Sequence, residues 1–213
     1  MHYLQKQLFQ HLYRSMPQIH DDQLQSLSIH LQDDLKCTLC HRDLLLDEKQ
    51  FGLNGCPVRF VTAYGPRENE THAIIAFIYK AIEKMDPYEI WGNGQQERDF
   101  TYVEDIVDGT ILCAEKISDM TPINLGTGVR YKMVDVAQMI FEILGWTPEK
   151  ISFDTSKPTG AGSRALDNSL AKELLGWEPR FSLREGLKKT IEWYSKNHKK
   201  QGHIDKSSLL EHN

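Results

Sequence analysis

The first 50 residues of this chain contain no glycine, alanine, valine or tryptophan, although the whole chain has 14 glycines and 4 tryptophans. A nucleotide-binding βαβ unit begins with a β-branched strand that runs into glycines, which let the backbone approach a pyrophosphate. Residues 1–50 cannot supply such a turn. Their leucines recur at helical spacing instead, as in Leu4, Leu8 and Leu12. The segment is therefore either a short helical pair or sequence unrelated to the fold that follows, and both alternatives stay open.

The charge and hydropathy of the chain exclude several classes of partner. A net charge of −5 and a pI near 6.0 argue against a nucleic-acid partner, which usually selects a basic surface. The lysines near the end are interpreted as part of a solvated polar tail, residues 198–213. No run of about 18 apolar residues is long enough to span a membrane, and the start has no secretory h-region. Four cysteines in 213 residues do not make a disulfide scaffold, so the cytoplasm is the expected compartment.

From Phe51 onward the sequence alternates strand and helix patterns, which indicates an α/β fold. Gly92-Asn93-Gly94 can supply the positive φ that a tight turn needs, and apolar residues flank it on both sides, so it predicts a small antiparallel ribbon. Two of the predicted helices should end at Gly145 and Gly176, and Ser182 with Glu185 three residues later predicts a capping box at the start of the last helix. The other predicted elements are strands at 57–63, 121–125 and 151–154, and helices at 72–85, 103–117, 132–144, 168–175 and 183–197.

A Cys-x-x-Cys-His sequence stands at residues 37–41. The pattern is that of c-type haem attachment, which requires export, and the chain has no export signal. The same residues could begin a zinc site, but a closed site needs four ligands, and only His30 and His20 lie near enough to add to it. We therefore interpret the spacing as incidental and predict no metal site.

Four blocks of sequence in the second part of the chain carry a resemblance. In order, they resemble the C-terminal half of the extended short-chain dehydrogenases: the NAD-dependent sugar-nucleotide epimerases and dehydratases, such as the UDP-glucose 4-epimerases, with the GDP-fucose synthases as close relatives. Any one block is weak evidence, but all four occur in order and at intervals typical of the family. The blocks are RFVTAYGPRE (59–68), WGNGQQERDFTYVEDIVDG (91–109), INLGTG (123–128), and LDNSLAKELLGWEP with LREGLKKTIEWY (166–179 and 183–194).

The resemblance implies a partial Rossmann-like sheet plus a small substrate-binding domain, over residues 51–197. It also implies a Tyr-x-x-x-Lys pair before these blocks, with Tyr as acid/base and Lys lowering its pKa, and a glycine-rich turn that holds NAD. Neither is found. The residues four positions after the first five tyrosines are Gln7, Pro17, Glu68, Glu83 and Gly92. We therefore expect that a head is missing or replaced, that NAD binding by this chain alone is doubtful, and that no catalytic residue is present.

The resemblance also assigns binding residues. It implies that Arg98 binds the nucleotide diphosphate, which suits the paired donors of a guanidinium; the alternative is a surface ion pair of Arg98 with Asp99 or Glu97. Thr62 stands where the family usually has Asn in contact with the sugar nucleotide. Phe60 and Val61 match residues that line the nicotinamide pocket, although apolar strand residues are more often plain core.

Lys157 and Arg164 lie in the segment that resembles the nucleotide clamp, with loop solvation as the alternative. His72 and Ala73 begin a helix whose N-terminal amides could take phosphate, or His72 is simply a surface residue. Asn124 and the turn at 126–128 should shape the site rather than touch the ligand. Trp177 and Trp193 should be packing residues.

The leading hypothesis is a sugar-nucleotide-binding portion of an NAD-dependent epimerase or dehydratase, with UDP-sugars favoured over GDP-sugars. One alternative is a non-catalytic subunit that pairs with a complete homologue. Another is an active enzyme with an atypical or partner-supplied cofactor site. Because the strands at 58–62 and 121–125 should belong to a parallel sheet that needs neighbours, we expect a chain that is poorly soluble or oligomeric alone, as a homo-oligomer or a hetero-oligomer.

Overall fold

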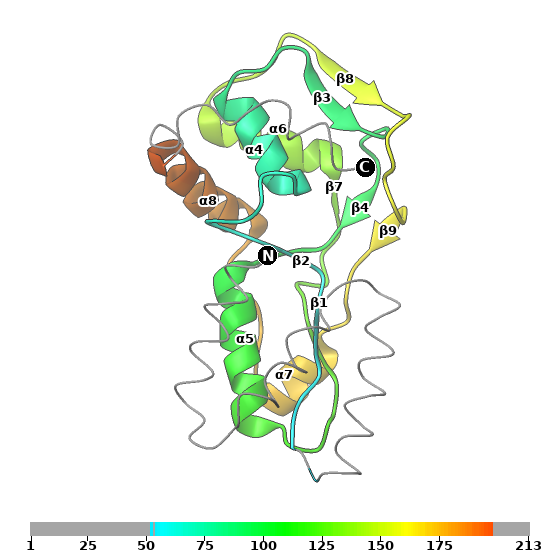
Figure 1. Cartoon of the computed structure of the whole chain (residues 1–213), viewed down its shortest axis with the longest axis vertical. Helices are drawn as coiled ribbons and strands as arrows, with labels where there is room; N and C mark the ends of the chain where they lie inside the picture. Colours follow the sequence, from blue (N-terminus) through cyan, green and yellow to red (C-terminus); the bar gives the residue numbers. More distant parts are fainter. Residues whose placement is uncertain (1–51, 53, 198–213) are drawn as a thin grey trace.

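The computed structural model describes residue 52 and residues 54–197, and the expectations for residues 1–50 and for the tail 198–213 lie outside this range. All five predicted helices are found, with their ends within three residues of the predicted bounds. Figure 1 labels all the elements except β5 and β6. In chain order the elements are β1 (Val58–Phe60), β2 (Thr62–Tyr64), α4 (Ala73–Ile82), β3 (Tyr88–Trp91), β4 (Glu97–Arg98), β5 (Phe100–Tyr102), α5 (Val103–Lys116), β6 (Ile123–Leu125), β7 (Tyr131–Lys132), α6 (Met133–Leu144), β8 (Ile151–Asp154), β9 (Ser163–Arg164), α7 (Ser169–Leu175) and α8 (Leu183–Asn197).

The described strands pair mainly in parallel. β1 pairs with β6, β2 with β5, and β3 with β8, all in parallel register. The fourth group is β7–β4–β9, in which β4 runs antiparallel to β7 and parallel to β9. Parallel strands joined by helices confirm the α/β prediction and the parallel pairing expected of the strands near 58 and 123.

The antiparallel ribbon predicted around Gly92-Asn93-Gly94 is wrong. Both glycines do have the predicted positive φ, at 74° and 73°. The turn nevertheless sends β3 and β4 to different partners, since β3 pairs with β8 and β4 with β7 and β9. A local turn signal therefore fixed the bend of the backbone but not the strand that each arm meets.

The strand predicted at 57–63 is two short strands. The amide of Ala63 donates to the carbonyl of Val61 at 2.9 Å, a spacing that closes a tight turn and breaks the extended backbone. β1 before the turn pairs with β6, and β2 after it pairs with β5. The bend at Val61 thus lets one continuous segment reach two different neighbours.

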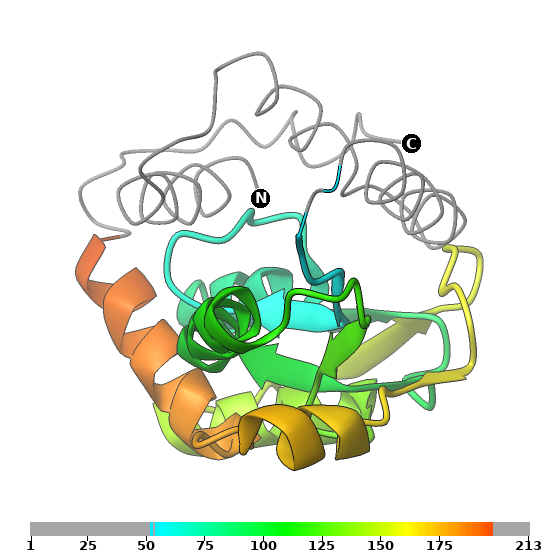
Figure 2. The same cartoon turned by 90° about the horizontal axis from the view of Figure 1, so that it is seen from below.

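The elements enclose two hydrophobic cores, which lie in the lower and upper parts of Figure 1. The lower core joins β1 and β6 to α5 and α7, and includes Ile123, Leu125 and Trp177. The upper core joins α4, α6 and α8 to β2, β3 and β5, and includes Tyr64, Tyr88 and Phe141. Figure 2 shows α5, α7 and α8 around the strands from below. This division agrees with the expectation of a partial Rossmann-like sheet beside a smaller domain.

The helix ends follow the predicted chemistry. Gly145 and Gly176 are left-handed C-cap residues of α6 and α7, with φ of 63° and 68°. At the start of α8, the Ser182 hydroxyl and amide both donate to Glu185 Oε2, at 2.6 and 2.9 Å. The amide of Glu185 donates back to Ser182 Oγ at 3.3 Å, which completes the predicted capping box.

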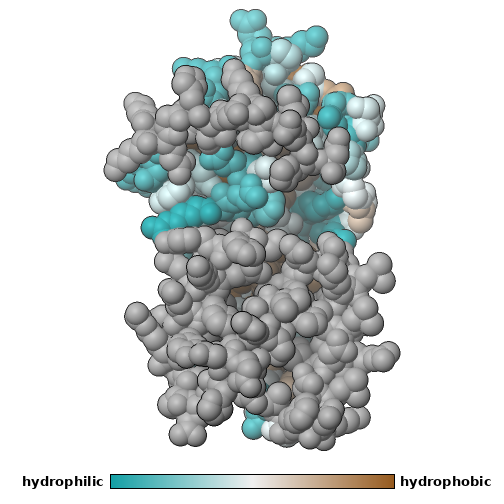
Figure 3. All heavy atoms as spheres, viewed as in Figure 1, coloured by the Kyte–Doolittle hydropathy of each residue, from teal (hydrophilic) through white to brown (hydrophobic). Residues whose placement is uncertain are grey.

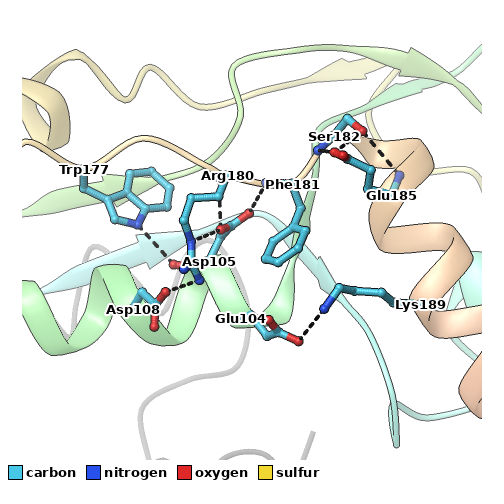
Figure 4. A network of polar contacts seen from close by, with 9 residues as sticks. All are labelled: Glu104, Asp105, Asp108, Trp177, Arg180, Phe181, Ser182, Glu185 and Lys189. Carbon is cyan, nitrogen blue, oxygen red and sulfur yellow. Dashed lines mark hydrogen bonds and ion pairs between the residues drawn. The ribbon is translucent and has the colours of Figure 1, made fainter.

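A polar network fastens α5 to the segment that leads into α8 (Figure 4). Asp105 is 1% exposed, and its carboxylate accepts the amides of Arg180 and Phe181 at 3.0 and 3.1 Å. The indole N–H of Trp177 donates to the carbonyl of Asp105 at 3.1 Å, as expected of a packing residue. Arg180 also pairs with Asp108. This network links the lower core to the upper one.

The coloured surface in Figure 3 is mainly hydrophilic over the upper part of the molecule, with smaller hydrophobic areas among it. Trp193, the other predicted packing residue, is partly buried against the upper core. Among the described residues, no helix has the length and apolar character needed to cross a bilayer.

Candidate functional site

Asp99, between β4 and β5, organises the loops at one edge of the strands. Its side chain is fully buried, and its Oδ1 accepts the amide and the hydroxyl of Thr127 at 3.1 and 2.5 Å. Its Oδ2 accepts the amide of Gly128 at 2.9 Å and that of Leu166 at 3.4 Å. One carboxylate therefore joins the β4–β5 junction to the turn after β6 and to the chain after β9.

Arg98 and Arg164 stand opposite each other on β4 and β9. The Arg98 guanidinium donates to the carbonyl of Glu97 at 2.7 Å and to that of Thr159 at 2.5 Å. Burial, and then the nearby positive charge of Arg164, lower the pKa of Arg98 from its ordinary value. The guanidinium groups of these two register partners repel each other, and an anion between them would remove the repulsion.

The loop after β8 lies against the glycine turn that precedes β4. A side chain at Gly92 would come within 2.4 Å of Thr159 Cγ2, and Gly92 has φ of 74°, so only glycine fits there. Lys157 in this loop places its ammonium 5.4 Å from the ring centroid of Trp91. The indole is 46% exposed, so a charged loop and an open aromatic surface lie at the same edge as the arginine pair.

Phe60, Val61 and Thr62 lie where the chain passes from β1 to β2. Phe60 is 42% exposed, so its interpretation as plain core is wrong, since it lies opposite Leu125 at the end of the strand rather than beneath a helix. Val61 and Thr62 are partly buried, and Thr62 pairs with Phe100 of β5. The three residues therefore lie beside the β6 turn and the start of β5, both of which adjoin Asp99.

His72 and Ala73 lie at the start of α4, as predicted, with His72 as the N-cap. His72 Nδ1 is 2.6 Å from Glu68 Oε1, and the Tyr194 hydroxyl donates to the carbonyl of Glu68 at 2.6 Å. Among the described residues, the contacts of His72 thus lead to Glu68 and α8 rather than to the arginine pair. The structure does not bring His72 together with Arg98, Lys157 and Arg164.

Asp99 and Trp91 are the residues that sequence reasoning missed. Asp99 was considered only as a surface partner of Arg98, and that ion pair is not formed, because the carboxylate is buried under the 126–128 turn. The available signal was an acid directly before the aromatic segment Phe100-Thr101-Tyr102, a position that requires hydrogen-bond donors if the segment is buried. The amides of the turn hold Asp99, and Asn124 donates to the carbonyl of Asp167 at 3.0 Å, while the absence of ligand contact at these residues stays a prediction.

Comparison with known proteins agrees with this geometry. Residues 41–126 match the family described as "NAD dependent epimerase/dehydratase family", and this match starts ten residues before the boundary placed at residue 51. The chain therefore belongs, over this region, to the NAD-dependent epimerase/dehydratase family. The segment that the family shares includes the Phe60–Thr62 bend, the Arg98-Asp99 pair and the turn after β6 as far as residue 126.

Several curated epimerase/dehydratase relatives resemble the chain over about 70% of its length. GDP-L-fucose synthase of Sinorhizobium fredii is 33% identical over 157 residues, which cover 70% of this chain and 49% of that protein. UDP-glucuronate 4-epimerase of Thermodesulfobacterium geofontis is 37% identical over 147 residues, which cover 69% and 45%. The chain thus spans about half the length of the curated relatives that it matches.

The fold agrees with solved structures of the same family. UDP-glucose 4-epimerase of Thermotoga maritima, solved with UDP-glucose, superposes with a TM-score of 0.72 at 29% identity, over 77% of this chain and 53% of that one. A dTDP-glucose 4,6-dehydratase of Bacillus anthracis, solved with NAD, gives 0.70 at 23% identity, over 79% and 54%, which supports the fold alone. The described elements therefore have the Rossmann-like α/β fold of these structures.

Proposed function

We propose that this chain binds the diphosphate of a nucleotide sugar between Arg98 and Arg164, and that it serves as the substrate-binding portion of an epimerase or dehydratase. The observation that carries the proposal is the pairing of the two arginines across β4 and β9. Burial is the larger cause of the lowered pKa of Arg98, and the repulsion from Arg164 is the second cause. A diphosphate carries the charge and the acceptors that would relieve this repulsion.

The position of the pair in the fold supports the same proposal. In open α/β sheets, ligands bind beyond the carboxyl ends of the parallel strands. β1 and β6 end at Phe60 and Leu125, and the turn after β6 is fixed to Asp99, next to Arg98. The arginines therefore stand beside the edge at which a nucleotide would enter.

The remaining predicted residues complete the proposed site. Lys157 would add a third positive charge from the loop that Arg98 holds through Thr159. The open face of Trp91 offers a flat apolar surface for a base or a sugar. Thr62 would contact the sugar, and Phe60 and Val61 would border a nicotinamide ring. His72 and Ala73 lie apart from the arginine pair and would take a phosphate only separately, through backbone amides at the start of α4.

We further propose that the 213-residue polypeptide does not perform the chemistry unaided. Its sequence holds no tyrosine followed four positions later by lysine, so the expected acid/base pair is not encoded. NAD is the cofactor named for the family, and the proposal expects that this polypeptide does not bind it tightly on its own. A complete homologue, as partner in a hetero-oligomer, could supply both functions, and a cytoplasmic location would suit such an assembly.

The test is a set of calorimetric titrations of the full chain with UDP, UMP, GDP, GMP and NAD⁺. We expect the diphosphates to bind at least about tenfold more tightly than the monophosphates, because the second phosphate meets the arginine pair. Comparison of UDP with GDP decides which base is preferred, with UDP favoured. Equal affinity for mono- and diphosphates would refute the arginine site, and tight NAD⁺ binding would refute the second proposal.

Variants locate the binding site. Arg98→Ala and Arg164→Ala should each weaken UDP or GDP binding by roughly 10- to 100-fold, as loss of a charge-assisted hydrogen bond does. Arg184→Ala is the matched control, because Arg184 is 45% exposed and pairs with Glu142 on another surface of the molecule. If all three variants bind the nucleotide diphosphate with the same affinity, the assignment of the site is contradicted.

A further inference from the structure

Two cysteine thiols contact each other in the lower core. Cys56, just before β1, is partly buried, and Cys113, in the last turn of α5, is buried at 1% exposure. Cys56 packs against the cluster that contains Cys113, and the two thiols lie close enough for Cys113 to act as a hydrogen-bond donor to Cys56 in setting their pKa values. Both thiols are reduced in the structure. The pair plays no part in the proposed nucleotide site.

The backbone around Cys56 is held firmly. The amide of Met120 donates to the carbonyl of Gly55 at 3.0 Å, and the amide of Ile123 donates to that of Pro57 at 2.9 Å. The Cys56 thiol itself lies 3.4 Å from the carbonyl of Thr121. Because ladder bonds on both sides fix the segment, Cys56 cannot easily swing away from Cys113.

The two sulfurs differ in chemistry. The hydrogen bond from Cys113 lowers the pKa of Cys56 below its ordinary value, although burial opposes this effect. The same hydrogen bond, followed by burial, raises the pKa of Cys113. Cys113 also lies near the C-terminal end of a helix, where the dipole disfavours an anion. The partly exposed thiol is therefore the more nucleophilic one, and the buried thiol is the proton donor.

We infer that Cys56 and Cys113 form an oxidisable dithiol, in which Cys56 attacks a low-molecular-weight disulfide such as glutathione disulfide and Cys113 resolves the product. The Cys56 thiolate attacks one sulfur of the small disulfide, and the first glutathione leaves as a thiolate. That thiolate takes the proton of Cys113, whose sulfur then attacks Cys56 Sγ and expels the second glutathione. The two protein thiols lose two electrons, and one small disulfide is reduced to two thiols.

The product would be a covalent link between the start of β1 and the end of α5. Such a bond closes a long loop of the chain, and disulfides of this kind restrict the unfolded state. We expect oxidation to raise the Tm by about 10 °C. Since β1 ends at Phe60, the oxidation state of the two cysteines would also set the rigidity of the edge that contains the Phe60–Thr62 bend.

The experiment uses the full chain with Cys37→Ser and Cys40→Ser, so that only the two thiols of interest remain. This reference protein is incubated with glutathione disulfide, quenched in acid, alkylated with a maleimide, and examined by intact mass and peptide mapping. We expect loss of both thiols together and a Cys56–Cys113 linked peptide. With Cys113→Ala in the same background, a single glutathione adduct on Cys56 should persist, since nothing resolves it.

The Cys56→Ser variant in the same background should react about tenfold more slowly than the reference, because its remaining thiol is buried and of raised pKa. A stable glutathione adduct on the reference protein, or two thiols that stay open to the maleimide, would overturn the inference. If a cysteine variant fails to fold, the linked peptide and the Tm shift of the reference protein still decide the question.

Discussion

Replacing Asp99 with alanine should be among the most damaging single changes at the edge of the strands. Its carboxylate accepts three short hydrogen bonds, from Thr127 N, Thr127 Oγ1 and Gly128 N, at 3.1, 2.5 and 2.9 Å. A fourth, from Leu166 N, is longer at 3.4 Å. Two segments of chain, the turn after β6 and the chain after β9, would therefore lose their common acceptor at once.

The magnitude follows from the burial of these groups. A buried donor left without a partner costs about 1–3 kcal/mol. Thr127 is only partly buried and Gly128 is exposed, so water can reach the freed donors, and the lower end of that range applies. Three donors then give a loss of about 3–4 kcal/mol in the free energy of unfolding. That is a large share of the roughly 5–15 kcal/mol that stabilises a typical domain.

Urea denaturation, followed by tryptophan fluorescence, measures this loss. Asp167→Ala is the matched control, because the exposed Asp167 accepts the same kinds of bond, from the amide and hydroxyl of Ser169 at 2.9 and 2.5 Å. Its loss should be far smaller, since solvent replaces both bonds. Equal destabilisation by the two variants would refute the claim that burial makes Asp99 the organising residue. Asp99→Asn should fall between them, because an amide oxygen keeps one acceptor.

Three further outcomes can be measured on the same protein. Gly186→Ala should prevent stable folding or lower the free energy of unfolding by more than about 3 kcal/mol, because the added Cβ would lie 2.1 Å from the Tyr64 hydroxyl in the upper core. A Tm close to that of the parent would contradict this packing. Ser182→Ala should cost about 1 kcal/mol in urea denaturation through loss of the capping box with Glu185, and no measurable change would show that α8 does not need the cap. Burial, and then the charge of Glu104, raise the pKa of Tyr102 to about 12. The contribution of this shift to stability is therefore complete below pH 10 and is lost as pH rises from 10 to 12. The Tyr102→Phe variant should lose less stability over this range, and identical curves of stability against pH for variant and parent would refute the prediction.

The helices could be predicted from sequence because their signals are local. The apolar stripe of α6 and its closing Gly145 lie within one short segment, and so do Ser182 and Glu185 at the start of α8. Each depends on contacts between residues a few positions apart, which fix the backbone wherever the segment finally packs. The same reasoning predicted the positive φ of Gly92.

The strand partners could not be predicted in the same way. The glycine turn at 92–94 favoured a ribbon, yet β3 found its partner in β8, some 60 residues later. No pattern in the sequence near β3 predicts that it pairs with β8, because pairing depends on which apolar faces meet in the folded core. The same holds for the bend at Val61, which exists because β1 and β2 have different neighbours.

Among the site residues, the types were predictable and the arrangement was not. Arg98, Lys157 and Arg164 were identified one by one, as groups able to bind phosphate, from their place in the recognised blocks. Only the structure showed that Arg98 and Arg164 are register partners, that Lys157 lies over Trp91, and that His72 turns to Glu68 instead. Side chains more than 60 residues apart in the chain become neighbours only after the sheet and loops are in place.

The sequence by itself determined the α/β class, the helix ends, the positions that require glycine, and the family resemblance, because each of these depends on residue types at short spacing. The tertiary structure decided the strand pairing, the exposure of Phe60, the burial of Asp99 and the contact of Cys56 with Cys113. Each of these depends on segments that are distant in the chain and meet only in the packed fold. Burial and hydrogen-bond partners, rather than residue type, then decide whether a carboxylate is a surface ion or, like Asp99, the acceptor that holds two distant segments.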